Sequence, residues 1–177
     1  MLFLPTELPG VFVIEPEPTG DDRGLFARTY CAEEFAHHGL CTQWAQCNVS
    51  FNTRAGTLRG MHWQAAPHEE VKLVRCTAGA ALDVVADARP DSPTYRKWVA
   101  VELTAANRRA VYIPGGYAHG FQTFADGTEL FYQMSAFYVP GAARGARWDD
   151  PALGIAWPPC DRRVIAPRDL SFPDLPT

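Results

Sequence analysis

The chain has 177 residues, of which 47% are apolar and 20% charged, and its formal net charge is −4. This length and composition predict one globular domain over residues 1–177 with a sizeable core, and they exclude a disordered or fibrous chain. The mild negative charge argues against nucleic acid as a partner, whereas an anionic small substrate stays possible where arginines gather.

The first residues and the cysteines bear on the compartment. Residues 1–10 lack the basic and apolar regions of a signal peptide, and no apolar run reaches membrane-spanning length. The five cysteines are scattered and form no CxxC pair, which is typical of reduced cysteines rather than of disulfides or a zinc site. We therefore expect a cytoplasmic protein without a membrane partner.

The first quarter of the chain predicts short strands and one helix. Residues 11–14 are an apolar strand, residues 21–24 a turn, and residues 25–30 alternate enough to form a second strand. Residues 32–38 form the only convincing helix, which Gly39 ends.

After this helix, strand-like runs recur at roughly ten-residue intervals, the spacing of an all-β sandwich or barrel. They cover residues 44–50, 57–63, 71–76, 80–86, 98–103, 110–113, 120–124 and 129–135. The tail from about residue 158 is rich in Pro and Arg, and we expect it to be irregular and packed over the sheet. The pattern predicts an all-β double-stranded β-helix jelly roll, whose interior can hold one small ligand.

One run concentrates polar chemistry: Gly56-Thr57-Leu58-Arg59-Gly60-Met61-His62-Trp63-Gln64. A lone histidine at a strand end is more often structural than catalytic. Strict alternation also places Arg59 and His62 on opposite faces of the strand. If both serve one pocket, the strand must bulge or bend between them, and Gly60 is the residue that allows it.

The run Pro114-Gly115-Gly116-Tyr117-Ala118-His119-Gly120 resembles the second motif of the cupins, which are small jelly-roll barrels. The first cupin motif carries two metal-binding histidines, but here the second histidine is replaced by Gln64, with Glu69 or Glu70 downstream. An amide is a poor ligand for zinc or iron. We therefore expect no metal and no cofactor, and a metal-dependent cupin enzyme is the alternative.

A closer resemblance covers residues 10–169. It rests on Arg23-Gly24-Leu25-Phe26, Gln46-Cys47-Asn48, Leu58 to Gln64, Lys72-Leu73-Val74, Asp83-Val84-Val85, Ile113 to Phe121, Tyr132 to Tyr138, and Trp148-Asp149-Asp150-Pro151, in that order. Together they resemble the dTDP-4-dehydrorhamnose 3,5-epimerases and their nucleotide-sugar relatives. The resemblance implies a homodimeric, cofactor-independent isomerase whose substrate is a nucleoside-diphosphate 4-keto sugar, with dTDP as the expected nucleotide.

The resemblance also implies catalytic roles that chemistry can check. A ketone at C4 acidifies the hydrogens at C3 and C5, and inversion needs a base on one face and a proton donor on the other. His62 corresponds to the base, Asp169 to the carboxylate that orients it, and Tyr132 to the opposite donor. Lys72 corresponds to the cation beside the ketone oxygen, where an ammonium would stabilise an enolate.

Other residues match positions that hold the substrate: Arg23, Phe26, Gln46, Asn48, Arg59, His119 and Tyr138. Arginines suit a diphosphate because one guanidinium reaches two oxygens, and flat rings can stack on a base. Taken singly, Phe26 and Tyr138 would be core aromatics and Arg23 a solvated turn charge.

Two departures concern selectivity. The chain has Arg28 and Ala143 where the family usually carries acidic residues. If both positions line the cleft, they change which sugar or nucleotide binds, or whether both carbons are epimerised; at a rim they would matter little. A catalytically silent sugar-nucleotide binding module is the second alternative to an epimerase.

Overall fold

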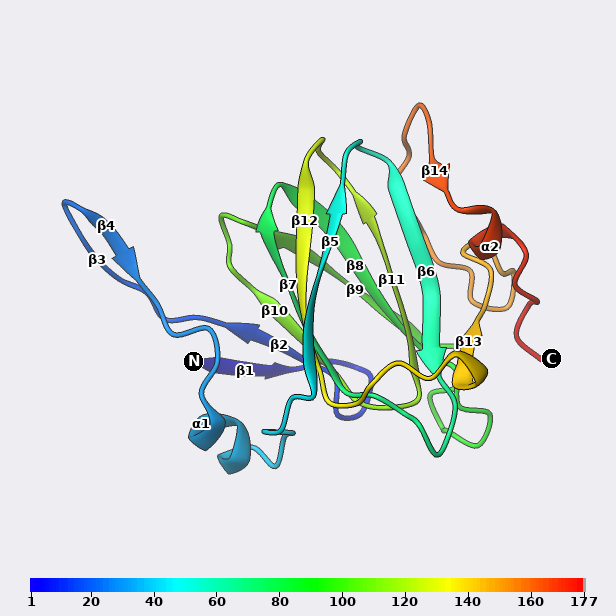
Figure 1. The fold of residues 1–177 in the computed structure, drawn as a ribbon, viewed down its shortest axis with the longest axis horizontal. Coiled ribbons are helices and arrows are strands. Elements are labelled where there is room, and N and C mark those ends of the chain that lie inside the picture. Colours follow the sequence, from blue (N-terminus) through cyan, green and yellow to red (C-terminus); the bar gives the residue numbers. More distant parts are fainter. Residues whose placement is uncertain (177) are drawn as a thin grey trace.

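The computed structural model describes residues 1–176, which form two six-stranded sheets, a separate hairpin and three short helices (Figure 1). The first sheet has the order β1 (Leu2–Pro5), β2 (Phe12–Glu15), β10 (Ala110–Ile113), β7 (Lys72–Ala78), β12 (Thr128–Met134) and β5 (Gln46–Asn52). The second has β13 (Ala143–Gly145), β6 (Thr57–Gln64), β11 (Tyr117–Thr123), β8 (Ala80–Asp87) and β9 (Trp98–Thr104), with β14 (Val164–Ile165) parallel to β6. The hairpin is β3 (Thr19–Asp21) and β4 (Gly24–Phe26), and the helices are α1 (Ala32–His37), η1 (Pro140–Ala142) and α2 (Pro167–Leu170).

The two sheets face each other and enclose the main core, so the predicted jelly roll is confirmed. Alternation along each strand sends one set of side chains inward. Val74 and Leu130 of the first sheet meet Val85 and Phe121 of the second, and all four are at most 2% exposed. Beside this core, the polar side chains of Lys72, Asp83 and His119 are also buried.

Segments near the two ends of the chain cover the outer faces of the sheets. Phe35 of α1 is fully buried against the first sheet, in a cluster with Leu73 and Tyr112. Trp157 and Leu153 of the long C-terminal segment pack over the second sheet. The C-terminal tail therefore does lie over a sheet, as its composition predicts, but it also contains β14 and α2.

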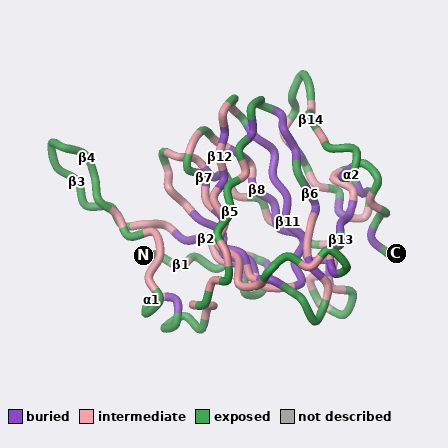
Figure 2. The backbone as a smooth tube through the Cα atoms, in the orientation of Figure 1, coloured by how far each residue is buried: buried purple, intermediate pink, exposed green. Residues whose placement is uncertain are grey.

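The first strands depart from the sequence-based prediction. The strand expected over residues 25–30 is wrong, because β4 ends at Phe26 and residues 27–30 pair with no strand. Strands β3 and β4 pair only with each other, and the hairpin that they form extends away from the barrel (Figure 1). Every residue in its two strands is exposed, as the green tube in Figure 2 shows.

None of the helices among residues 1–176 is long and apolar enough to cross a membrane.

Candidate active site

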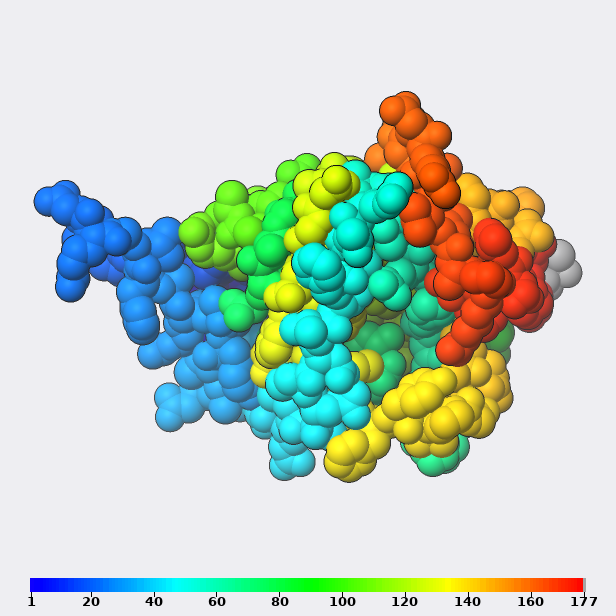
Figure 3. Space-filling model, turned by 45° about the horizontal axis from the view of Figure 1, so that its top comes forward, coloured from blue at the N-terminus to red at the C-terminus, as the bar shows by residue number. Residues whose placement is uncertain are grey.

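A cavity of about 420 Å³ lies between the sheets. In Figure 3 the surface is hollowed between the cyan strand β5 and the red C-terminal segment. Seven residues predicted from the sequence line the cavity: Asn48, Arg59, His62, Lys72, His119, Tyr132 and Asp169. They come from both sheets and from α2, so the fold assembles the site from distant parts of the chain.

A distortion of β6 allows two of these residues to serve one cavity. The register of β6 against β11 shifts after Arg59, and Gly60 has a φ of +134°. A Cβ at Gly60 would lie 2.5 Å from the Cα of Gly120, so only glycine fits there. Arg59 and His62 therefore both line the cavity, which confirms the predicted irregularity at Gly60.

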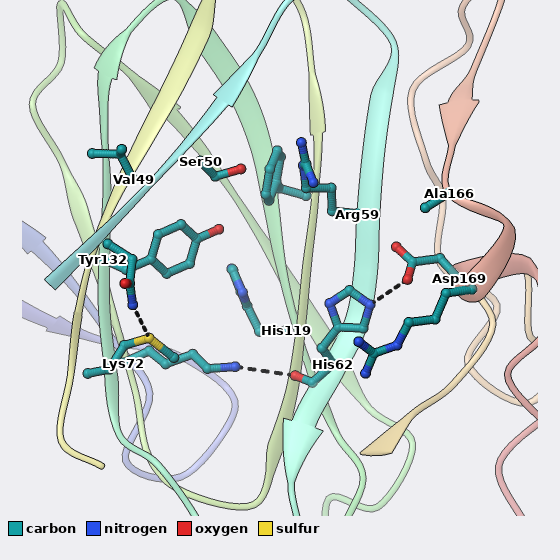
Figure 4. A pocket seen from close by; sticks show the side chains of 13 residues that line it. Val49, Ser50, Arg59, His62, Lys72, His119, Tyr132, Ala166 and Asp169 are labelled. Atoms are coloured by element: carbon teal, nitrogen blue, oxygen red, sulfur yellow. Dashed lines mark hydrogen bonds and ion pairs between the residues drawn. The ribbon is translucent and has the colours of Figure 1, made fainter. Parts of the chain in front are cut away.

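His62 is held by a carboxylate from the C-terminal segment. Its Nε2 lies 2.8 Å from Oδ1 of Asp169, and Oδ2 of the same carboxylate accepts the Gly60 N–H at 3.2 Å (Figure 4). Burial acts to raise the pKa of Asp169. The hydrogen bonds from His62 and Gly60 and the charge of His62 lower this pKa by a larger amount, so the net shift is downward. An ionised Asp169 accepts a hydrogen bond from the Nε2–H group of His62, which leaves Nδ1 as the basic ring nitrogen.

A tyrosine lies on the opposite wall. Tyr132 of β12 and His62 of β6 point into the cavity from different sheets (Figure 4). Burial raises the pKa of Tyr132 well above its usual value, the charge of Asp83 adds to this, and Arg59 partly offsets it. The phenol therefore keeps its proton at neutral pH and can donate it.

His119 lies beside this tyrosine, with the two rings 5.8 Å apart in an edge-on arrangement. Its Nε2 is 2.8 Å from Oδ2 of Asp83, and both side chains are buried. His119 therefore has one ring nitrogen committed to a carboxylate, as His62 does.

Lys72 supplies a cation to the floor of the cavity. Its Nζ is 3.1 Å from Oε1 of Glu70 and 3.4 Å from the carbonyl oxygen of His62. Arg59 adds a second cation, with its Nε donated to Oδ1 of Asn52 at 2.9 Å. The cavity thus combines an imidazole, an opposing phenol and two cationic side chains, an arrangement suited to moving protons on an anionic ligand.

The other predicted binding residues are not all in this cavity. Asn48 lines it and donates Nδ2 to Sδ of Met134 at 3.1 Å, but Gln46 and the exposed Tyr138 do not line it. Met134 and Arg168 also line the cavity, although the sequence motifs did not identify them. Alternation from Tyr132 places Met134 on the same face of β12.

Arg23 and Phe26 lie on the projecting hairpin, outside the cavity of their own chain. Arg23 pairs with Asp21, and Phe26 is 83% exposed. Arg28 and Ala143, the two positions where the family usually carries acidic residues, also lie outside the cavity. The Arg28 guanidinium is 2.8 Å from the carboxylate of Glu34, and Ala143 pairs with Gln64, the last residue of β6. Within one chain, neither position changes the charge of the cavity wall.

The described residues do not fit a metal site. Within residues 1–176, no group of three or more His, Cys, Asp or Glu side chains is placed to hold an ion. Gln64, at the position of the second cupin histidine, accepts the Val139 N–H at 2.7 Å and donates to Glu70 at 3.2 Å. Both ends of its amide are therefore committed to the protein.

Comparisons with known proteins agree on one family. Residues 5–177 match the family model described as dTDP-4-dehydrorhamnose 3,5-epimerase. A dTDP-4-dehydrorhamnose 3,5-epimerase of Sinorhizobium fredii is 40% identical over 175 residues, covering 99% of this chain and 90% of its own.

Solved structures give the same result. A 4-keto-6-deoxy sugar epimerase from the novobiocin cluster of Streptomyces spheroides superposes with a TM-score of 0.94 at 38% identity, covering 99% of this chain and 87% of its own. A 3'-monoepimerase of Streptomyces bikiniensis, solved with dTDP-quinovose, superposes at 0.91 with 34% identity, covering 97% and 86%.

Proposed function

The chain belongs to the dTDP-4-dehydrorhamnose 3,5-epimerase family of isomerases, and we propose that it epimerises a dTDP-linked 4-keto-6-deoxy sugar at C3, C5 or both. The observation that carries this proposal is the pair formed by His62 and ionised Asp169, which faces protonated Tyr132 across one cavity. The relatives support the substrate class, since they are named for 4-keto-6-deoxy or dTDP-linked sugars.

The first step is removal of a carbon-bound proton. Nδ1 of His62 takes the proton from the carbon beside the ketone, the C–H bond breaks, and its electrons move onto the ketone oxygen as an enolate. Asp169 holds the imidazole and stabilises the imidazolium that forms. Lys72 places a positive charge where the enolate oxygen develops, and this charge stabilises the enolate without a metal.

The second step returns a proton from the other face. The O–H bond of Tyr132 breaks, a C–H bond forms on the face opposite His62, and the enolate electrons return to the carbon. The carbon is thereby inverted, and the tyrosinate and imidazolium exchange protons with water to reset the site. His119 and Asn48 hold the sugar beside these groups, and Arg59 binds the diphosphate.

We also infer that the active form is a homodimer. Tyr132 and its cross-strand partner Asn48 face the cavity, so Phe131 of β12 and Phe51 of β5 lie on the outer face. On this outer face Phe51 is 58% exposed, and Val49, which borders the cavity, is 60% exposed. A second copy would cover this apolar face and bring its projecting hairpin within reach of the neighbouring cavity. Phe26 and Arg23 would then hold the nucleotide of the partner.

The test follows hydrogen exchange at carbon. Wild-type protein is incubated with dTDP-4-keto-6-deoxyglucose in deuterated water, and NMR identifies the carbons that gain deuterium. We expect deuterium at C3, C5 or both, with inversion at the same carbon. Exchange at both carbons and exchange at one carbon each match the name of a similar protein, since one relative is named a 3,5-epimerase and another a 3'-monoepimerase.

His62→Asn is the matched catalytic variant. General-base catalysis contributes about 10²–10⁴ in rate, so kcat should fall by at least about a hundredfold while dTDP still binds. Near wild-type turnover in His62→Asn would refute the assignment of the base. Nucleotide binding without any exchange by wild type would indicate a binding module, and activity that depends on an added metal would indicate a metal-dependent cupin.

A further inference from the structure

Lys72 of the cavity is paired with the carboxylate of Glu70, which has no role in the proposed mechanism. Oε1 of Glu70 lies 3.1 Å from Nζ of Lys72, and the two side chains are 6% and 8% exposed. Glu70 does not line the cavity, so it lies behind the lysine as seen by a ligand. A buried charge without a partner is costly, and each of these groups therefore stabilises the charge of the other.

The geometry around the ammonium fixes its direction. An ammonium has three N–H donors. One points to Glu70 and another to the carbonyl oxygen of His62 at 3.4 Å, the contact drawn as a dashed line in Figure 4. The third donor is left for a ligand in the cavity that Lys72 lines.

The carboxylate is itself held in place. Gln64 is 2% exposed, and its Nε2 lies 3.2 Å from Oε2 of Glu70, 3.0 Å from the carbonyl oxygen of His68 and 3.2 Å from that of Phe137. Oε1 of Gln64 accepts the N–H of Val139 at 2.7 Å. The carboxylate therefore cannot swing away from the lysine without breaking this network.

We propose that Glu70 is a positioning residue that pairs with the ammonium of Lys72 and aims its remaining N–H at the ketone oxygen of the substrate. The inference rests on the role of Lys72 in the proposed function. The competing interpretation is that the pair only joins the segment before β7 to the sheet. In that case removal of the carboxylate would affect stability but would not act through Lys72.

A double-mutant cycle separates these interpretations. Glu70→Gln keeps the size of the side chain and removes its charge. Coupled neighbours interact by amounts worth roughly tenfold to a hundredfold, so kcat should fall by that factor while KM changes less than about threefold. In a Lys72→Met background the same change should lower kcat by less than about twofold. An equal loss in both backgrounds would overturn the proposal.

Two further variants complete the cycle. Glu69→Gln alters the neighbouring exposed carboxylate, and kcat should stay at the wild-type value. Glu70→Asp keeps the charge, so it should retain more of kcat than Glu70→Gln. The reverse order would contradict a role for the charge, and Glu70→Asp also provides a test if Glu70→Gln does not fold.

A second measurement does not depend on catalysis. Lys72 and Lys97 are the only lysines in the chain, and Lys97 is exposed, so it is an internal reference. Reductive methylation with ¹³C-formaldehyde requires an uncharged amine. We expect the labelling of Lys72 relative to Lys97 to rise at least about threefold in Glu70→Gln, because the charge of the ammonium loses its partner. An unchanged ratio would overturn the proposal.

The two measurements also distinguish a failure of this inference from a failure of the proposed function. If wild type exchanges no hydrogen at carbon while the labelling ratio still rises in Glu70→Gln, the proposed function fails and the pairing of Lys72 by Glu70 stands. If wild type is active and the ratio is unchanged, the proposed function stands and the role of Glu70 fails.

Discussion

At the scale of single residues, the two walls of the cavity place their titratable groups in different environments. On one wall Asp169 is ionised and accepts a hydrogen bond from His62, which leaves the imidazole a free basic nitrogen. On the other wall burial and the charge of Asp83 raise the pKa of Tyr132, so the phenol stays protonated. The site therefore sets a hydrogen-bonded imidazole opposite a protonated phenol, the two groups that the proposed mechanism uses.

Tyr132→Phe tests the acid side. The variant keeps the ring and removes only the hydroxyl, so net inversion should fall by about 10²–10⁴, the usual contribution of a positioned acid. Deuterium exchange should fall less, because His62 can still remove a proton and return one to the same face. NMR in deuterated water measures both rates. Wild-type inversion and exchange in Tyr132→Phe would leave the tyrosine with a packing role only.

The resemblance read from the sequence predicted residues that the fold brings together. The order of motifs identified His62, Lys72, Tyr132 and Asp169, and all four line one cavity. It did not identify Glu70 as the partner of Lys72, because a contact between a loop residue and the strand after it depends on how the loop folds back. Composition and spacing carry no such information.

At the scale of elements, the bend in β6 decides whether the site exists. Gly60 has a φ of +134°, where other residues are strained, and its neighbour across the sheet leaves no room for a side chain. Strict alternation would place Arg59 and His62 on opposite faces of the strand. Because β6 bends between them, both side chains line the cavity. A single glycine thus links backbone geometry to the placement of the base.

Gly60→Ala should therefore cost both stability and activity. Strained backbone positions cost about 1–3 kcal/mol each, and the close approach to Gly120 adds to this. Urea unfolding measures the free energy of unfolding, and turnover reports the position of His62. Gly127→Ala is the control, since Gly127 also has a positive φ of +65° but no atom lies within 4 Å of an added Cβ. Equal losses in the two variants would mean that crowding at Gly60 contributes nothing.

The loop that follows β8 is held by a buried carboxylate. Burial acts to raise the pKa of Asp87, but hydrogen bonds from Arg89, Ser92 and Thr94 lower it from 3.8 to about 2. A depressed pKa in the folded state stabilises the protein above the unfolded value, and this stability is lost as pH falls from about 4 to about 2.

Asp87→Asn should lower the free energy of unfolding at pH 7 by up to about 2 kcal/mol, the equivalent of that pKa difference. The loss should shrink as pH falls toward about 2, where the wild-type carboxylate becomes protonated. Urea unfolding of both proteins at several pH values measures it. A difference that stays constant across this range would show that the charge of Asp87 is not the cause.

Periodicity predicted the long strands, and it failed where elements are short. The two-residue strand β14 and the four-residue α2 have too few residues for a period, and they form where the C-terminal segment meets β6. The strand expected over residues 25–30 alternates correctly but finds no partner strand beyond Phe26. Partner availability is a property of the fold, so local pattern could not reveal it.

At the scale of the whole molecule, two exposed apolar features have no function within a single chain. The β3–β4 hairpin extends into solvent with Phe26 83% exposed, and Phe51 on the outer face of β5 is 58% exposed. Apolar surface of this kind is typical of an interface. A homodimer would give both features a role, because the same contact would bury the sheet face and carry each hairpin toward the other cavity.

Mixing two impaired variants tests this arrangement. Phe26→Ala should raise KM roughly tenfold to a hundredfold through lost stacking on the base, and His62→Asn should lower kcat by at least about a hundredfold. In a hybrid dimer, the Phe26→Ala subunit keeps His62 and receives an intact hairpin from its partner. Differently tagged subunits, co-expressed and purified as hybrids, should therefore recover about half the wild-type activity at low substrate, since one of two sites is whole.

The number of intact active sites in a hybrid dimer also defines the control and the result that would contradict the prediction. A hybrid of His62→Asn with Asp169→Asn has a defect in each cavity, because both residues line the cavity of their own chain, and it should stay inactive. If Phe26 served its own chain, the hybrid of Phe26→Ala with His62→Asn would also have a defect in each cavity. Absence of recovery, with hybrid dimers present in solution, would therefore assign the hairpin to its own subunit or to no site.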